Sequence, residues 1–103
     1  MRIRFEWDPA KAKSNLRKHR VSFEVATRVF ADPFAVVMQD RIENGEYRWR
    51  TLGIVDGYLL LLVAHTVRED KDGIEVVRII SARRAEPKER KFYEEKAARH
   101  EGV

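Results

Sequence analysis

The sequence has no cysteine, only three prolines and five glycines, and no long hydrophobic run. Without cysteine, neither disulfide bonds nor thiolate-bound zinc can stabilise the fold, and nothing indicates an oxidising compartment. The longest apolar run, residues 58–64, has about a third of the roughly 20 residues that a membrane-spanning helix needs. The amino-terminal segment reaches an acidic residue, Glu6, before any apolar stretch could form the core of an export signal. We therefore expect a cytoplasmic protein with no membrane partner.

The sequence also has no internal repeat, low-complexity segment or linker, so we expect residues 1–103 to form a single domain. Hydrophobic residues make up 44% of the chain, which is enough apolar material for one core and argues against disorder. The 21 Lys and Arg residues exceed the 17 Asp and Glu residues by only four. Such an excess favours a polyanionic partner only if the cations gather on one face.

Alternating apolar residues predict strands, and capping and turn residues predict where helices begin and end. Asp8-Pro9 is typical of a helix start, and Ser22 predicts a second helix that Asp32-Pro33 ends. Residues 40–46 are expected to form an exposed loop. The expected strands cover residues 2–7, 34–39, 47–55, 58–67 and 74–81, and the expected helices cover residues 9–19, 23–31 and 87–99.

The order of these elements is strand, helix, helix, four strands and a final helix. Asp56-Gly57 is the strongest hairpin signal in the sequence, and the short connection at residues 71–73 indicates a second antiparallel pair. The strand-helix-strand alternation of a parallel nucleotide-binding fold is absent. The sequence therefore predicts an α+β fold in which helices pack on an antiparallel sheet.

Arginines cluster in the sheet region of the sequence. Residues 78–84, Arg-Ile-Ile-Ser-Ala-Arg-Arg, form a cationic exit from the last expected strand. Arg48 and Arg50 lie on the strand over residues 47–55, and Arg68 follows the next strand, so neighbouring strands could gather these cations over one sheet surface. Because the guanidinium group matches pairs of phosphate oxygens, this pattern indicates a phosphate site. The competing interpretation is a solvated basic face paired with local carboxylates.

His65 lies on a strand, on the face opposite Ala64 and Thr66, and is the candidate for acid-base chemistry because histidine titrates near neutrality. A lone histidine in a strand is nevertheless more often structural. His19 at the end of the first helix is better explained as a group that complements the helix dipole. The histidines are scattered, and residues 70–73 form only a fragment of a calcium loop, so we expect no metal site and no cofactor.

Two clusters of residues resemble the signature of the BrnT family. The first cluster comprises Phe5-Glu6-Trp7-Asp8, Lys11, Asn15, Lys18-His19, Val21-Ser22-Phe23-Glu24, Phe30 and Asp32. The second comprises Arg48, Gly53, Arg78-Ile79-Ile80-Ser81-Ala82-Arg83-Arg84-Ala85, Glu89 and Tyr93. Together they cover roughly residues 5–94. One position departs from the pattern: the family usually has glycine where this chain has Arg20, which should cost on the order of 1 kcal/mol if that residue is left-handed.

The resemblance implies a small ribonuclease with a fold similar to RelE, the toxin of a type II toxin-antitoxin pair. It also implies neutralisation by a BrnA antitoxin whose ribbon-helix-helix domain binds DNA, so that DNA is contacted only through the antitoxin. We assign charge stabilisation in metal-independent RNA cleavage to Arg78 and Arg83, assisted by Arg48 and Arg68, and proton transfer to His65. The residues expected to contact RNA are Lys11, Lys18, Arg50 and Arg84, with Lys18 also a reserve for proton transfer.

Two other functions fit the same residues. The cations could serve a noncatalytic RNA- or DNA-binding module, in which aromatic side chains on the sheet stack on bases. The chain could also be a pure interaction subunit with an exposed apolar face. The catalytic interpretation predicts that Arg48, Arg68, Arg78 and Arg83 converge on one solvent-accessible cleft.

Overall fold

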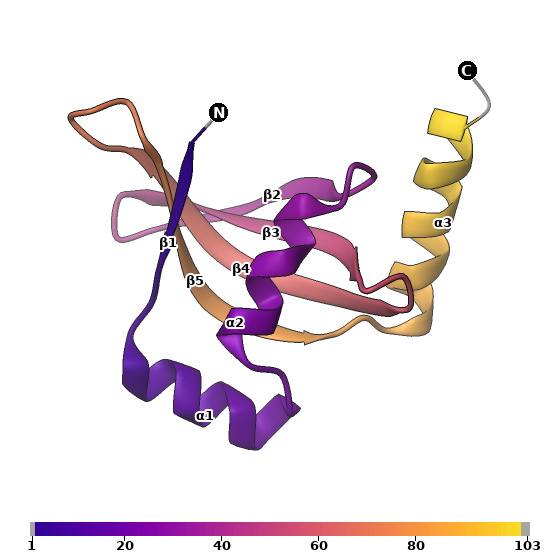
Figure 1. The fold of residues 1–103 in the computed structure, drawn as a ribbon, viewed down its shortest axis with the longest axis horizontal. Helices are drawn as coiled ribbons and strands as arrows, with labels where there is room; N and C mark the ends of the chain where they lie inside the picture. The colour runs from indigo at the N-terminus through magenta and orange to yellow at the C-terminus, as the bar shows by residue number, and fades with distance from the viewer. Residues whose placement is uncertain (1, 102–103) are drawn as a thin grey trace.

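The structure is a computed structural model that describes residues 2–101, and the side chains of residues 2–99. Its elements follow the predicted order, except that the helix expected over residues 23–31 is a short α-helix followed by a 3-10 helix (Figure 1). The strands are β1 (Ile3–Glu6), β2 (Val36–Glu43), β3 (Glu46–Val55), β4 (Leu59–Glu69) and β5 (Glu75–Arg84). The helices are α1 (Pro9–His19), α2 (Phe23–Ala26), the 3-10 helix η1 (Thr27–Ala31) and α3 (Pro87–Glu101). None of the helices in the described part of the chain is long and apolar enough to cross a membrane.

The five strands form one sheet in the order β1-β5-β4-β3-β2. Strands β2 to β5 make an antiparallel meander, as predicted. β1 differs from the prediction because it pairs parallel to β5. β1 and β2 lie at opposite edges of the sheet, and the helices between them carry the chain across it. β1 is therefore placed beside β5 and runs in the same direction as that strand. The fold class is therefore α+β with a mostly antiparallel sheet.

The two faces of the sheet are covered differently. α2 and η1 cover one face, which we call the helix face (Figure 1). The main core on this face includes Phe23, Val63 and Ile79. The opposite face is covered only at one end, where Tyr93 of α3 packs with Leu52 and other leucines. The remainder of that face is left open by the described helices.

Several strand boundaries differ from the prediction, and the differences that bear on the site concern charged residues. β4 continues to Glu69, so Arg68, expected to follow this strand, lies inside it. β2 and β3 extend into the predicted loop, so that only Asn44 and Gly45 connect them. Both turn residues have positive φ, 52° and 77°, which asparagine and glycine tolerate and which matches the twist of a hairpin. β5 continues to Arg84, so Arg83 and Arg84 lie inside the strand and not beyond it.

Asn15 fixes α1 beside the sheet. Its side-chain amide donates hydrogen bonds to the carbonyls of Val21 and Ala82, at 3.0 and 2.8 Å, and its carbonyl oxygen accepts one from the Ala82 N–H at 3.1 Å. Ala82 lies past the end of β1, so the amide replaces a missing strand partner at this edge. The residues of α1 that flank Asn15 on this side are thereby held next to β5.

α3 is attached to the sheet through Asp32. The Tyr93 hydroxyl donates a hydrogen bond to one carboxylate oxygen of Asp32 at 2.6 Å, and that oxygen also accepts the Ile54 N–H at 2.8 Å. Burial, followed by this hydrogen bond, raises the pKa of Tyr93 above its usual value. Phe92 is 37% exposed. Of the α3 side chains that the structure describes, Tyr93 and Ala97 face the core, because α3 covers just the end of the sheet.

Candidate active site

Strand alternation places five arginines on the open face of the sheet. Leu62, Ala64 and Thr66 are alternate residues of β4, so their side chains lie on one face of the sheet. Their strand partners lie on the same face: Arg83 opposite Leu62, Arg50 opposite Ala64 and Arg78 opposite Thr66. Arg48 and Arg68 follow by their even spacing along the same strands. We call this surface the arginine face, defined by Arg48, Arg50, Arg68, Arg78 and Arg83. The expected gathering of cations over one sheet surface is confirmed.

A pocket of about 260 Å³ lies between α1 and the part of the arginine face that carries Arg48 and Arg78. It brings together the β1–α1 junction, α1 itself, the β2–β3 turn and strands β3 and β5. Its lining residues are Asp8, Lys11, Asn44, Glu46, Arg48, Arg78, Ile79 and Ile80. We call it the Arg48–Arg78 pocket. Ile80 is the extra residue of a bulge in β5, which lies where the register shifts between Ala64 and His65.

Arg78 and Glu46 form the central ion pair of this pocket. The Arg78 Nη2 atom donates to Glu46 Oε1 at 2.8 Å, and the two side chains remain 40% and 45% exposed. An ion pair this exposed contributes at most about 1 kcal/mol to stability. A phosphate group can therefore displace Glu46 from Arg78 at little energetic cost.

The Arg48 side chain is more buried than that of Arg78, but its contact with a carboxylate is longer. Its side chain is 16% exposed, and its Nη2 atom lies 3.8 Å from the Glu43 carboxylate. Among the residues that the structure describes, its Nε atom is buried and has no hydrogen-bond partner. A buried donor left unpaired costs about 1–3 kcal/mol, and such groups are worth examining for a functional role.

Lys11 contributes the third cation of the pocket, from the α1 surface that Asn15 fixes beside β5. A second, smaller pocket of about 190 Å³ continues from the first and shares Lys11 and Ile80 with it. Lys18 and His19 line this second pocket. Lys11 and Lys18 thus lie along one polar seam between α1 and β5.

Arg68 and Arg83, the other two arginines expected in the cleft, do not line the Arg48–Arg78 pocket. Arg68 binds both carboxylate oxygens of Glu6, at 2.8 and 3.3 Å, and this hydrogen bonding lowers the pKa of Glu6. Arg83 binds both oxygens of Glu89 at 2.9 Å, which lowers the pKa of Glu89. The pocket therefore unites Arg48 and Arg78 and leaves Arg68 and Arg83 outside.

The remaining two predicted RNA-binding arginines lie further from the pocket. Arg50 is on the arginine face but lines a different pocket, next to α3. Arg84 pairs with Leu61, whose side chain is in the core of the helix face. It lines a hollow with Leu16, Arg20 and Val25, and it lines neither the Arg48–Arg78 pocket nor the smaller pocket beside it.

His65 is buried, with 2% of its surface exposed, and it faces the core beneath η1. Its ring lies edge-on to Phe30 at 5.0 Å, and its Nε2 atom is 2.7 Å from the Thr51 hydroxyl. Burial lowers the pKa of His65 to about 4. The acid-base role assigned to His65 does not fit this environment. Strand alternation correctly separated it from Ala64 and Thr66, but it could not show that η1 covers the face on which His65 lies.

Sequence reasoning missed Glu46, because residues 40–46 were expected to form a loop. In the structure Glu46 is the first residue of β3, two positions before Arg48 and on the same face. The Asn44-Gly45 pair was the available signal: a two-residue hairpin turn would have placed Glu46 on the strand.

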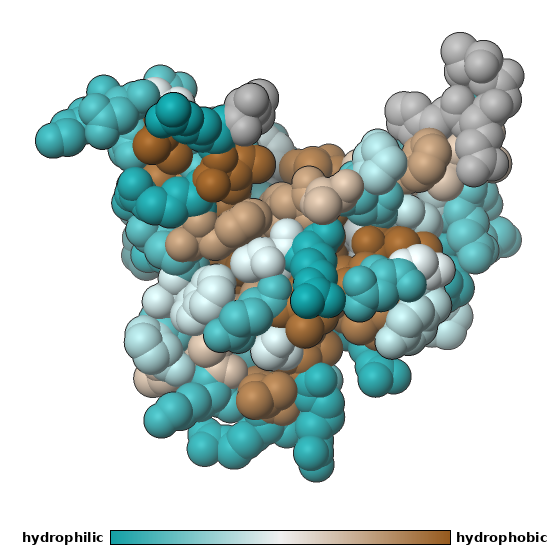
Figure 2. Space-filling view, viewed as in Figure 1, coloured by the Kyte–Doolittle hydropathy of each residue, from teal (hydrophilic) through white to brown (hydrophobic). Residues whose placement is uncertain are grey.

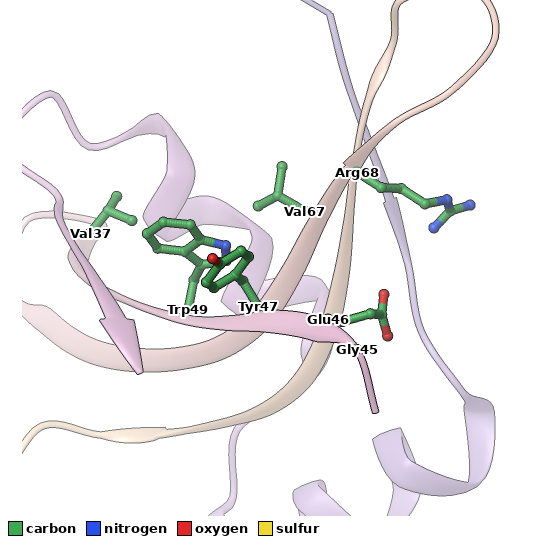
Figure 3. A pocket seen from close by; sticks show the side chains of 7 residues that line it. All are labelled: Val37, Gly45, Glu46, Tyr47, Trp49, Val67 and Arg68. Carbon is green, nitrogen blue, oxygen red and sulfur yellow. The ribbon is translucent and has the colours of Figure 1, made fainter. Parts of the chain in front are cut away.

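A larger pocket lies on the helix face, at the end that α2 and η1 leave open. It has a volume of about 570 Å³. Figure 3 shows Val37, Tyr47, Trp49 and Val67 around it, with Glu46 and Arg68 to one side. Val37 is 58% exposed and Tyr47 53%. Figure 2, which views the molecule from the side of α2, likewise shows apolar residues at the surface above this helix. We call this the Trp49 pocket.

Comparison with known proteins identifies the family. The model of the ribonuclease toxin BrnT of type II toxin-antitoxin systems matches residues 7–89, which is most of the chain. The chain belongs to the BrnT family. It is thus a ribonuclease toxin of a type II toxin-antitoxin system, which implies an RNA substrate and an antitoxin partner.

A solved BrnT structure agrees with this fold. The 1.1 Å crystal structure of the Brucella abortus ribonuclease toxin BrnT is similar to this chain, with a TM-score of 0.63 and 19% sequence identity. The similarity covers 84% of this chain and 99% of that one. No functionally curated protein matches the sequence significantly. Within this BrnT-family chain, the signature residues Lys11, Arg48 and Arg78 are the three cations that line the Arg48–Arg78 pocket.

Proposed function

We propose that this BrnT-family toxin cleaves RNA without a metal ion, in the Arg48–Arg78 pocket. The observation that carries the proposal is the meeting of two arginines, one lysine and one carboxylate around a solvent-open pocket. Cleavage needs a base for the 2′-hydroxyl, cations for the pentacoordinate phosphorane, and an acid for the leaving 5′-oxygen. The pocket contains a chemical group suited to each requirement.

Arg48 and Arg78 bind the scissile phosphate and stabilise the charge that accumulates on its oxygens as the phosphorane forms. Preorganised donors of this kind usually provide the largest single catalytic contribution. Arg48 is well suited because its low exposure leaves the guanidinium little freedom to reorganise. Its Nε atom has no hydrogen-bond partner among the described residues, so the group has a donor still to be satisfied. Arg78 exchanges its ion pair with Glu46 for the phosphate.

Glu46, released from Arg78, removes the proton from the 2′-hydroxyl, and the 2′-oxygen attacks phosphorus. Lys11 donates a proton to the 5′-oxygen as the bond between that oxygen and phosphorus breaks. The products are a 2′,3′-cyclic phosphate and a free 5′-hydroxyl. His65 has no part in this scheme because the core separates it from the pocket.

The other cations have supporting roles. Lys18 contacts a neighbouring phosphate along the seam between α1 and β5, and Arg50 contacts the RNA on the opposite side of the pocket. Arg83 fixes the start of α3 through Glu89, and Arg68 fixes β1 through Glu6. We assign no RNA contact to Arg84.

The toxin acts in the cytoplasm, where cleavage inhibits translation and growth, and a BrnA-like antitoxin neutralises it. The Trp49 pocket supports this partner assignment, because an exposed apolar surface of this kind is typical of protein interaction sites. An amphipathic segment of the antitoxin fits it better than RNA does. The ribbon-helix-helix domain of the antitoxin supplies DNA binding for the pair.

A cleavage assay in EDTA tests the proposed function. Purified toxin without antitoxin, incubated with total RNA and EDTA, should produce discrete fragments, and added antitoxin should stop their formation. A noncatalytic binding module would retard the RNA without shortening it. Cleavage that appears only when a divalent metal is restored would refute the metal-independent mechanism.

A further inference from the structure

A third pocket, of about 500 Å³, lies on the arginine face where β2 and β3 meet the first turns of α3. Met38 and Leu52 give it an apolar side, and Arg50, Glu86 and Lys88 give it charged groups. The ring of Phe92 also lines it, and we call it the Phe92 pocket. Its size and mixed lining are typical of small-molecule sites, which combine apolar walls with a few polar groups.

The Phe92 pocket continues from the proposed active site along β3. Glu46, Arg48, Arg50 and Leu52 alternate onto the same face, and the first two line the Arg48–Arg78 pocket while the last two line the Phe92 pocket. Successive residues on one face of a strand are about 7 Å apart. An RNA strand whose phosphate lies between Arg48 and Arg78 can therefore place an adjacent base over Arg50.

Phe92 is a suitable stacking surface for such a base. It is 37% exposed and lies outside the core that Tyr93 completes, so packing does not explain its position. The Lys96 ammonium lies over its ring, 5.4 Å from the centre. Bases stack readily on aromatic side chains of this kind, whatever their sequence.

The charged groups distinguish between bases. The Arg50 Nε atom is buried without a hydrogen-bond partner among the described residues, and Glu86 is an exposed carboxylate acceptor. Guanine offers acceptors at O6 and N7, which arginine pairs with more often than with any other base, and it also carries N–H donors that a carboxylate can accept. Adenine has a donor where guanine has O6, and the pyrimidines present a smaller surface for stacking.

We propose that the Phe92 pocket binds a guanine base of the RNA beside the scissile phosphate, with Phe92 stacking on the base and Arg50 donating to its edge. This proposal rests on the proposed function, because the cleavage site fixes where the strand lies. The Arg83–Glu89 ion pair positions the start of α3, and Glu89 itself lines the pocket.

Binding of uncleavable RNA tests the pocket independently of catalysis. The probe is a short fluorescent oligouridylate with 2′-O-methyl groups, compared with the same oligonucleotide carrying one guanine, and the readout is fluorescence anisotropy. The wild-type protein should bind the guanine-containing oligonucleotide more tightly. Phe92→Ala should weaken that binding about tenfold. Arg50→Gln should bring the two affinities together.

Tyr58→Ala is the matched control, because Tyr58 is an aromatic residue that is 73% exposed beside the β3–β4 turn and lines none of these pockets. It should leave both affinities unchanged. Equal wild-type affinities for the two oligonucleotides, or unchanged binding by Phe92→Ala, would overturn the proposal. Failure of the proposed function would give a different result. The protein would still bind the guanine-containing oligonucleotide more tightly but would not cleave total RNA, which means that the base site exists without catalysis.

Discussion

His65 is a titratable residue that the fold keeps neutral. The carbonyl of Thr66 can only accept, so the contact of 3.4 Å from His65 Nδ1 places the ring proton on Nδ1. Nε2 then accepts from the Thr51 hydroxyl at 2.7 Å. Thr51 and His65 are buried at 1% and 2% exposure, so each satisfies the other within the core. A charged imidazolium here would lose the Thr51 hydrogen bond and its hydration together.

This environment predicts that His65 makes the protein sensitive to acid. The folded-state pKa is about 4, below the unfolded value near 6.5, so the unfolded state binds more protons between these limits. The contribution to stability is fully present above the unfolded pKa and is lost as the pH falls toward 4, up to about 3 kcal/mol. Urea unfolding near neutral pH and at about pH 4.5 should show this loss.

His65→Gln is the control for acid unfolding, because glutamine can hydrogen bond to Thr51 and does not titrate. Its stability should fall less than that of the wild type over the same pH interval. If both proteins lose the same free energy of unfolding, the carboxylates and not His65 account for the acid sensitivity.

Structural features that depend only on nearby residues in the sequence, such as helix caps, could be predicted for single residues. Asp8 accepts the Ala10 N–H at 2.8 Å and Ser22 accepts the Val25 N–H at 3.1 Å, as their capping positions indicate. The burial of His65 and the pairing of Arg78 with Glu46 could not be predicted in this way. Both depend on which element covers a face or which strand lies opposite, and these are properties of distant parts of the chain.

At the scale of the element, α1 ends on a residue of the wrong type for its conformation. Arg20 has φ 61° and ψ 28°, and its N–H donates to the Leu16 carbonyl at 2.9 Å. Arg20 is therefore left-handed, the conformation in which the departure from the family's glycine carries a cost. Glycine adopts it without the steric conflict that a Cβ atom introduces.

Arg20→Gly should therefore stabilise the protein by roughly 1 kcal/mol, or about 4–8 °C in Tm for a domain of this size. Thermal unfolding measures the change. Arg17→Gly is the matched control, because it removes the same side chain from the interior of α1 and should destabilise by roughly 1 kcal/mol. Equal losses in the two variants would mean that the Arg20 side chain has a stabilising contact of its own.

Gly53 illustrates why a signature residue can matter for packing and not for chemistry. A Cβ atom at this position would lie 2.9 Å from both the Cβ and the carbonyl oxygen of Val29 in η1. The absence of a side chain lets η1 lie directly on β3 and bury Val29 fully. Element order and hairpins followed from the sequence, whereas this contact and the parallel pairing of β1 required the folded arrangement.

Across the whole molecule, several arginines are paired with carboxylates nearby. Arg4, Arg28, Arg68 and Arg83 each bind a carboxylate at 3.2 Å or closer. These pairs weaken the positive field that the same arginines would otherwise produce. In the proposed function, the feature that matters most is the pocket in which a phosphate takes the place of the carboxylate partner of Arg78.

The last prediction concerns that exchange. Arg78→Ala should lower the RNA-cleavage rate by about 10²- to 10³-fold while leaving the fold and antitoxin binding nearly intact. The rate should fall because the Arg78 guanidinium binds the phosphorane more strongly than the ground-state phosphate. The fold should survive because the lost ion pair with Glu46 is about half exposed and contributes at most about 1 kcal/mol. Cleavage rates, thermal melts and antitoxin pull-down on one purified variant measure all three effects.

Arg28→Ala provides the comparison for Arg78→Ala, since Arg28 forms an ion pair with Asp56 at 3.2 Å that is more exposed than the Arg78–Glu46 pair, and neither Arg28 nor Asp56 lines the pocket. It removes the same charge and so separates a general electrostatic loss from a catalytic one. If both variants cleave RNA equally slowly, Arg78 acts only through net charge. If Arg78→Ala unfolds at a lower Tm than the wild type and its activity falls only in proportion to the fraction unfolded, Arg78 has a structural role. A folded Arg78→Ala toxin that binds antitoxin and cleaves at the wild-type rate would remove Arg78 from the active site, and the pocket with it.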